Sequence, residues 1–137
     1  MRMLVREYKE EDLERLQQIH AAQNFPYDFP DLRNPLFLAK IVLTDGEDAN
    51  EKILGAALLR LTAEAYLLLD PSQGSPRERW QSLLALHAAA QQDAWERGLE
   101  DVHAWLPPAI AKKFGRRIER LGWLRDDAWT PYCKRIS

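Results

Sequence analysis

Residues 62–98 read TAEAYLLLDPSQGSPRERWQSLLALHAAAQQDAWERG, and they decide the fold because they predict a strand, a tight loop and a long helix. Residues 65–69 are apolar throughout, as in a strand that is buried on both faces. Asp70-Pro71 ends this strand. Apolar side chains then keep helical spacing over residues 76–97, and Gly98 suits the C-terminal cap.

The start of this helix has the residues of a capped N-terminus. Ser75 can accept a hydrogen bond from a backbone N–H group, Glu78 can reach back in a capping box, and Pro76 fits the first helical position. Free N–H groups and the helix dipole at such a point favour a bound anion. The stretch from Leu69 to Pro76 is therefore predicted to bind an anion.

The rest of the chain extends this unit on both sides. The strand after the long helix completes a β–α–β unit, so its two strands are expected to be parallel with a right-handed crossover. At 137 residues the chain is expected to form a single domain, residues 1–137. The expected strands are residues 3–7, 37–44, 53–61, 65–69, 101–105, 123–125 and 129–136, and the expected helices are residues 10–23, 76–97 and 109–121.

Composition excludes several classes of function. A net charge of −2 argues against general binding of nucleic acid. The single Cys133 cannot form an internal disulfide, which favours a reducing, cytoplasmic setting. No group of His, Cys and carboxylate residues has ligand spacing, so no metal site is expected. We expect neither a signal peptide nor a membrane span, since no stretch has the required apolar length.

The loop of residues 24–35, NFPYDFPDLRNP, is too apolar for a simple linker. Its prolines block regular structure, while Phe25, Tyr27 and Phe29 must pack on something. One interpretation is a lid over the core. The other is the wall of a substrate site, because binding groups often lie on loops that a scaffold holds.

Several short motifs follow one another along the chain. They are Val5-Arg6-Glu7-Tyr8, Glu11-Asp12-Leu13, Ile53-Leu54-Gly55-Ala56-Ala57, Leu69-Asp70-Pro71, Gly98, Arg120-Leu121-Gly122-Trp123 and Tyr132-Cys133-Lys134. In this order and spacing the chain resembles the GNAT superfamily of acyl-CoA-dependent N-acyltransferases over nearly its whole length. The resemblance implies an α+β fold in the wider α/β class: a mixed, largely antiparallel twisted sheet with a central parallel strand pair and flanking helices.

The resemblance also implies a site. Acetyl-CoA, or another acyl-CoA, would lay its pantetheine arm along the backbone of the strand that holds Leu67 and Leu69. The pyrophosphate would lie on the following loop and helix start, at Gln73, Gly74, Ser75, Arg77 and Arg79. Glu64 would be the general base, and Phe25, Tyr27 and Phe29 would line the site of a small-molecule or peptide amine.

The chain departs from the pattern of this family at three places. Arg77 and Arg79 stand roughly where the family has glycines, and Pro76 removes a backbone donor. Ile118 stands where many members have a proton-donating tyrosine, and Leu106-Pro107-Pro108 follows the strand after which they often have an asparagine. Either the two arginines replace the backbone donors with charge-assisted contacts, or the phosphate site is closed.

Two functions therefore stand side by side. The first is an N-acyltransferase that moves an acetyl or other acyl group from acyl-CoA to a primary amine by direct attack. The second is a catalytically inactive binding or regulatory module on the same fold. A monomer or a homodimer fits either function.

The remaining polar candidates have structural and functional interpretations. His20 and His87 fall on apolar faces of helices and are expected to pack, whereas His103 adjoins the predicted cleft and is the histidine to test first. The basic residues of the last helix would form a solvated face or meet CoA phosphates. They are Lys112, Lys113, Arg116, Arg117 and Arg120.

Overall fold

The computed structural model describes residues 1–127 and 129–137, and in these residues the chain has a mixed α+β fold. A three-stranded antiparallel sheet is followed by a small parallel strand pair, with three α-helices. The strands are β1 (Met3–Glu7), β2 (Phe37–Asp45), β3 (Lys52–Arg60), β4 (Ala63–Glu64) and β5 (Val102–His103). The α-helices are α1 (Leu13–Gln23), α2 (Pro76–Glu96) and α3 (Pro108–Glu119), and short 3-10 turns lie at Glu10–Asp12 and Asp48–Asn50.

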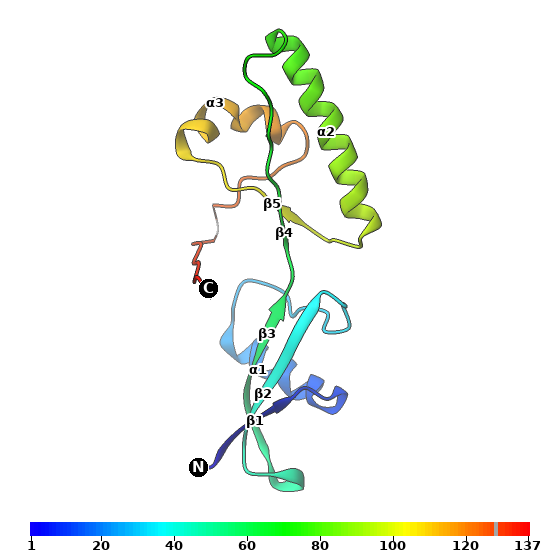
Figure 1. Ribbon diagram of the computed structural model, residues 1–137. Helices are drawn as coiled ribbons and strands as arrows, with labels where there is room; N and C mark the ends of the chain where they lie inside the picture. The colour runs from blue at the N-terminus through cyan, green and yellow to red at the C-terminus, as the bar shows by residue number, and fades with distance from the viewer. Residues whose placement is uncertain (128) are drawn as a thin grey trace.

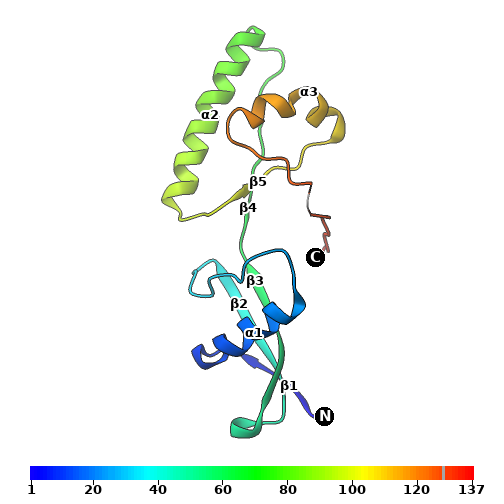
Figure 2. The same cartoon turned by 180° about the vertical axis from the view of Figure 1, so that it is seen from behind.

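The molecule is elongated, with two halves that lie end to end (Figure 1). The first half holds β1, β2, β3 and α1, and the second holds β4, α2, β5 and α3. The view from behind shows α1 in front of the sheet and α2 and α3 beside each other at the far end (Figure 2). β3 leads almost directly into β4, so the chain crosses between the halves at Leu61 and Thr62.

The three-stranded sheet has the order β1-β2-β3 and carries the main core on one face. Side chains alternate between the two faces of a strand, so every second residue of β2 points toward α1. Val42 on that face is completely buried, and it packs with Leu16 of α1 and Leu32 of the proline-rich loop. The loop thus covers the core with Leu32 and Phe29, as the lid interpretation predicts.

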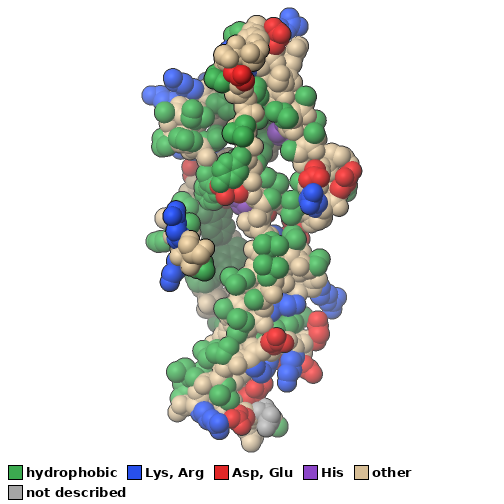
Figure 3. Space-filling model, viewed as in Figure 1, with side chains coloured by type: hydrophobic (Ala, Val, Ile, Leu, Met, Phe, Trp, Pro, Cys, Tyr) green, Lys and Arg blue, Asp and Glu red, His purple; other side chains and the backbone are tan. Residues whose placement is uncertain are grey.

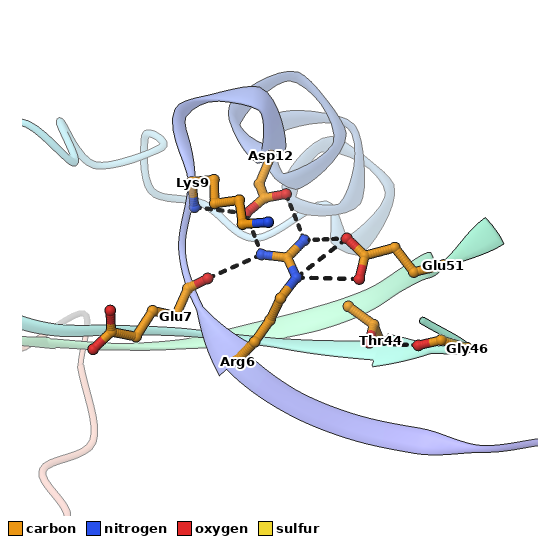
Figure 4. A network of polar contacts seen from close by, with 7 residues as sticks. All are labelled: Arg6, Glu7, Lys9, Asp12, Thr44, Gly46 and Glu51. Carbon is orange, nitrogen blue, oxygen red and sulfur yellow. Dashed lines mark hydrogen bonds and ion pairs between the residues drawn. The ribbon is translucent and has the colours of Figure 1, made fainter. Parts of the chain in front are cut away.

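A charged network joins three segments of this half (Figure 4). The Arg6 guanidinium of β1 donates to both carboxylate oxygens of Asp12 at 2.8 Å and to Glu51 just before β3. These hydrogen bonds lower the pKa of both carboxyl groups, and they raise the pKa of Arg6. Asp12 is buried and also accepts from the Lys9 N–H at 2.8 Å. The network therefore joins β1, the start of α1 and the start of β3.

The predicted parallel strand pair around a crossover helix is confirmed, although its first strand lies before the predicted residues 65–69. β4 and β5 are parallel, with Ala63 opposite Val102 and Glu64 opposite His103, and α2 is the crossover helix. α2 begins at Pro76 as predicted, and Ser75 and Glu78 form the predicted capping box. α3 packs on α2 through Phe114, whose ring lies 6.3 Å from that of Trp80.

Some predicted strands are wrong. The pairing lies at β4, whereas residues 65–69 run without a strand partner toward the start of α2 (Figure 1). Residues 123–125 and 129–136 form no strand either. The parallel pair is consequently a separate two-stranded sheet, not the centre of a continuous one. The cause is the short β5, which meets Leu106-Pro107-Pro108 soon after His103 and offers residues 65–69 no further ladder.

Candidate functional site

Glu64 and His103 lie opposite each other in the parallel pair, so their side chains share one face. Glu64 is exposed, and the His103 side chain is 43% exposed. The structure therefore brings together the predicted general base and the histidine that the sequence marks as the first to test.

Asp101 and Trp105 extend the same face of β5, because residues two apart on a strand point the same way. The His103 Nε2 atom is 3.7 Å from the Asp101 carboxylate, and the His103 and Trp105 rings stack at 6.3 Å. Asp101 also accepts from the Arg60 guanidinium at 3.2 Å, across the junction of the two halves. Asp101 thus lies beside His103 and ties β5 to the end of β3.

Tyr66 is a candidate that the family pattern does not supply. It lies two residues after Glu64, and a hydrogen bond to the Glu64 carboxylate raises the pKa of the Tyr66 hydroxyl. The sequence contains a signal that could have found Tyr66 and Asp101. Each lies two residues from Glu64 or His103, and residues two apart on a strand share a face. The result is a set of four titratable side chains around one exposed strand pair.

An unpaired backbone edge begins beside this set. The Ala65 N–H donates to the His103 carbonyl at 2.7 Å, and this is the last bond of the ladder. Among the described residues, 66–69 make no backbone hydrogen bond beyond it. The side chain of Leu67 is half exposed and that of Leu69 is half buried. Such an edge offers alternating donors and acceptors to an extended partner that carries amide groups.

In the loop after this edge, backbone N–H groups donate hydrogen bonds to carboxylates of the same chain. Asp70 accepts from the Ser72 N–H at 2.9 Å and from the Ser72 hydroxyl at 2.7 Å, and these bonds lower the pKa of Asp70. The Glu78 carboxylate accepts from the Ser75 N–H at 3.2 Å, and the Ser75 hydroxyl caps the Glu78 N–H. Two negative charges therefore occupy donors that a phosphate would otherwise use.

The two arginines of the loop differ. Arg79 turns back and donates to the Gly74 carbonyl at 2.7 Å, so it supports the loop. Arg77 is exposed, and the hydrogen bonds of the described residues include none from its guanidinium. Gly74 has φ +75°, which suits glycine, and a Cβ there would lie 3.2 Å from the Glu78 Cβ atom. Of the predicted phosphate contacts, Arg77 and Gln73 are thus the exposed side chains for which the described residues show no side-chain hydrogen bond.

The aromatic loop does not lie on the strand pair. Tyr27 and Phe29 pack edge-on to His20 of α1 at 5.1 and 5.6 Å, and Phe25 stacks on Tyr27 at 5.7 Å. Tyr27 also lies 6.1 Å from Trp129. Phe25 and Tyr27 are partly exposed, so they remain candidates for a substrate wall.

The other candidates have structural roles. His87 accepts a hydrogen bond from the Trp123 indole at 2.9 Å, and His20 packs between the rings of Tyr27 and Phe29, so both pack as expected. Cys133 is exposed. In residues 1–127 and 129–137 no group of three His, Cys, Asp or Glu side chains could hold a metal ion. The helices of the same residues are too short or too polar to cross a bilayer. The five basic residues of the last predicted helix, including Arg120 just after α3, are all exposed.

Comparisons with protein families, with characterised proteins and with solved structures find no match to this chain. The site itself is therefore the basis for a functional assignment.

Proposed function

We propose that the chain is an N-acyltransferase that uses an acyl-CoA donor and a primary amine acceptor. The observation that carries this proposal is the unpaired backbone of residues 66–69, which starts directly beside the Glu64–His103 pair. An arm with two amide groups can bind to such an edge as an added strand. Its reactive end would then lie near Glu64, while its phosphates would reach Arg77.

The chemistry requires a base and an acid. The donor supplies the acyl group as a thioester. Glu64 takes a proton from the acceptor ammonium, so that the nitrogen lone pair can attack the carbonyl carbon. The Tyr66 hydroxyl gives a proton to the departing thiolate as the C–S bond breaks. The surplus proton on the newly acylated nitrogen then restores the Tyr66 hydroxyl. Ile118 cannot supply that proton, and Tyr66 takes its place.

Thermal melting with and without millimolar acetyl-CoA is the first test. A ligand that binds only the folded chain raises the midpoint, and saturation well above the Kd gives a rise of about 3 °C or more. Arg77→Ala should reduce this rise, whereas Arg79→Ala should reduce it less because Arg79 bonds to Gly74. No rise with acetyl-CoA or with CoA would contradict the donor assignment.

Thiol release with a panel of primary amines tests the reaction. Glu64→Gln should lower kcat/KM by about 10²- to 10⁴-fold, as for the loss of a general base. Tyr66→Phe should lower kcat in the same assay. Glu119→Gln and Tyr132→Phe are matched controls at exposed positions and should leave the rate unchanged. Equal rates in Glu64→Gln and in the unchanged chain would rule out Glu64 as the base.

The second function, an inactive binding module, is favoured by a different observation. Asp70 and Glu78 occupy N–H groups of the loop with their own negative charge. If this closes the phosphate site, the chain binds a partner without phosphates along residues 66–69. A rise in melting temperature with an N-acylated pantetheine fragment, but none with CoA, would support this function.

A further inference from the structure

β3 and β4 follow each other in one line from the first half of the molecule into the second, and one edge of this line is open (Figure 1). β3 is the outermost strand of its sheet, and β4 pairs only with β5. Among the described residues no strand covers the other edge of either one. Hydrophobic side chains lie at the surface of both halves and of the junction between them (Figure 3).

The direction of the backbone groups shows which residues face this open edge. In a strand, the N–H and C=O groups of successive residues point to alternate edges. The Leu61 N–H donates to the Leu36 carbonyl just before β2, and the Ala65 N–H donates to the His103 carbonyl of β5. Odd-numbered residues therefore point toward the existing partner strands. The residues that point to the open edge are Ala56, Leu58, Arg60, Thr62, Glu64, Tyr66 and Leu68.

A second copy that lies along this edge has one register that uses all of it. The open edge extends from Ala56 to Leu68, so its midpoint is Thr62. A two-fold axis beside Thr62 and perpendicular to the sheet makes the two strand lines antiparallel and places Thr62 opposite its own copy. Arg60 then lies opposite the second copy's Glu64, and the symmetry forms this pair twice.

The charges that meet in this register are complementary. Opposite charges on directly opposed residues stabilise a strand pair, whereas like charges destabilise it. Arg60 already donates to Asp101 of its own chain at 3.2 Å. A guanidinium has five N–H donors and can hold two carboxylates, as Arg6 does in the first half. Arg60 can therefore keep its own partner and also bind the second copy's Glu64.

The apolar side chains that meet are complementary in size. Leu59 and Leu67 are 63% and 49% exposed in the single chain, and each lies opposite an alanine of the second copy. A large side chain beside a small one packs without a clash. The apolar pairs of this register are Leu58 with Tyr66, Leu59 with Ala65, Ala57 with Leu67 and Leu61 with Ala63.

The second half of the same chain cannot cover this edge of β3. A return between Arg60 and Ala63 would be a two-residue hairpin turn, which needs a positive φ at Leu61. Neither Leu61 nor Thr62 has a positive φ, and both residues disfavour it. The chain consequently stays elongated and exposes 11883 Å², against about 7,400 Å² for a compact monomer of 15.9 kDa. A copy along the β3–β4 line covers surface of both halves.

We propose that a second copy of this chain pairs with the open edge of β3 and β4, antiparallel and with the two-fold axis beside Thr62. The two β3–β4 lines then form the centre of one continuous sheet. The odd-numbered Leu67 and Leu69 keep their N–H and C=O groups on the side of β5, where the donor is proposed to bind. The dimer is therefore compatible with the proposed activity and does not depend on it.

Sedimentation equilibrium of the unchanged chain should give about twice the chain mass of 15.9 kDa. Thr62→Pro should weaken dimerisation by about tenfold or more, because each copy loses a donor at the centre of the interface. The Thr62 N–H makes no hydrogen bond within the described chain, so the monomer should keep its fold, which circular dichroism would check. Thr62→Val retains the donor and is the matched control, which should remain a dimer.

A cross-link gives an answer even where proline disturbs the fold. Thr62→Cys with Cys133→Ser leaves one thiol in each chain. Opposed residues of a hydrogen-bonded antiparallel pair have Cα atoms about 5.5 Å apart, which suits a disulfide. This variant should form covalent dimers in a glutathione buffer, whereas the control Ala88→Cys with Cys133→Ser, exposed on α2, should not.

Three results would overturn the proposal. They are a monomeric unchanged chain, dimerisation of a folded Thr62→Pro variant as strong as that of the unchanged chain, and no more cross-linking at Thr62→Cys than at Ala88→Cys.

Discussion

Arg6 is the residue on which the first half of the molecule most depends. Its guanidinium satisfies a buried carboxylate, Asp12, and an acidic side chain from a distant part of the chain, Glu51. The other cation in the network of Figure 4 is Lys9, whose backbone N–H donates to Asp12 and whose charge lowers the pKa of both carboxyl groups by less than the Arg6 hydrogen bonds do. Loss of Arg6 would leave the Asp12 charge buried and poorly compensated.

Arg6→Ala should lower the free energy of unfolding by about 3 kcal/mol, as for a buried ion pair that loses one partner. Arg125→Ala is the control, because the Arg125–Asp127 pair is three-quarters exposed and should contribute less than about 0.5 kcal/mol. Urea denaturation followed by circular dichroism measures both values. Similar losses in the two variants would contradict this role for Arg6.

The same network makes stability depend on acid. Hydrogen bonds from Arg6 lower the pKa values of Asp12 and Glu51 in the folded chain. Groups with lowered pKa values stabilise the fold above their unfolded values, near 4, and this stabilisation is lost as the pH falls through the folded values. As the pH is lowered below about 4, the melting temperature should therefore decrease. The fall should be smaller in Arg6→Ala, and equal falls would contradict the assignment.

At the scale of elements, α2 shows that a cap and an anion site compete for the same N–H groups. The cap uses Ser75 and Glu78, and the loop before it uses Asp70. The sequence predicts a cap and an anion site equally well. Ser-Pro-x-Glu is typical of a helix cap, and a strand that leads into a helix start is typical of an anion site. Only the structure shows that the protein's own carboxylates occupy the donors.

Ser75→Ala should lower the free energy of unfolding by about 1 kcal/mol through loss of the cap.

Glu78→Gln should strengthen the binding of an anionic ligand, because it removes a negative charge from the helix start. We expect CoA to bind Glu78→Gln more tightly than the unchanged chain in calorimetric titration. Weaker binding would mean that Glu78 orders the loop for the ligand. Glu96→Gln, at the far end of α2, is the control and should leave CoA binding unchanged.

The sequence predicts most of the elements but not how far the second half pairs. The predicted bounds of β1, α2 and β3 lie within about a residue of the observed ones, because local periodicity and capping determine them. Pairing depends on a neighbour. Residues 65–69 are as apolar as a central strand, yet they lack a partner where β5 stops. The family resemblance made Glu64 predictable as a candidate, whereas its position opposite His103 required the register.

At the scale of the whole molecule, the two halves differ in how well they are packed. The buried residues of the first half include Leu16, Leu32 and Val42, whereas Leu83 is the buried apolar residue of the second half among those described. Polar contacts such as Asn34 to Glu100 at 2.7 Å join the halves. Exposed contacts of this kind couple the halves weakly.

The second half should therefore open more often than the first. We expect slow amide exchange around Val42 and fast exchange over α2 and α3, since protection follows local stability. Hydrogen exchange read by mass spectrometry would measure this difference on the unchanged chain. Uniform protection along the chain would show a single cooperative unit, as the single-domain prediction expects.

The unpaired run of residues 66–69 also affects how the free protein behaves at high concentration. The run is uncharged, contains no proline and makes no backbone hydrogen bond, which are properties of segments that stack into cross-β fibrils. Any molecule that occupies this edge competes with fibril growth. If the proposed donor binds here, thioflavin fluorescence of the concentrated chain should rise more slowly with CoA present, and an equal rise with and without CoA would contradict binding at this edge.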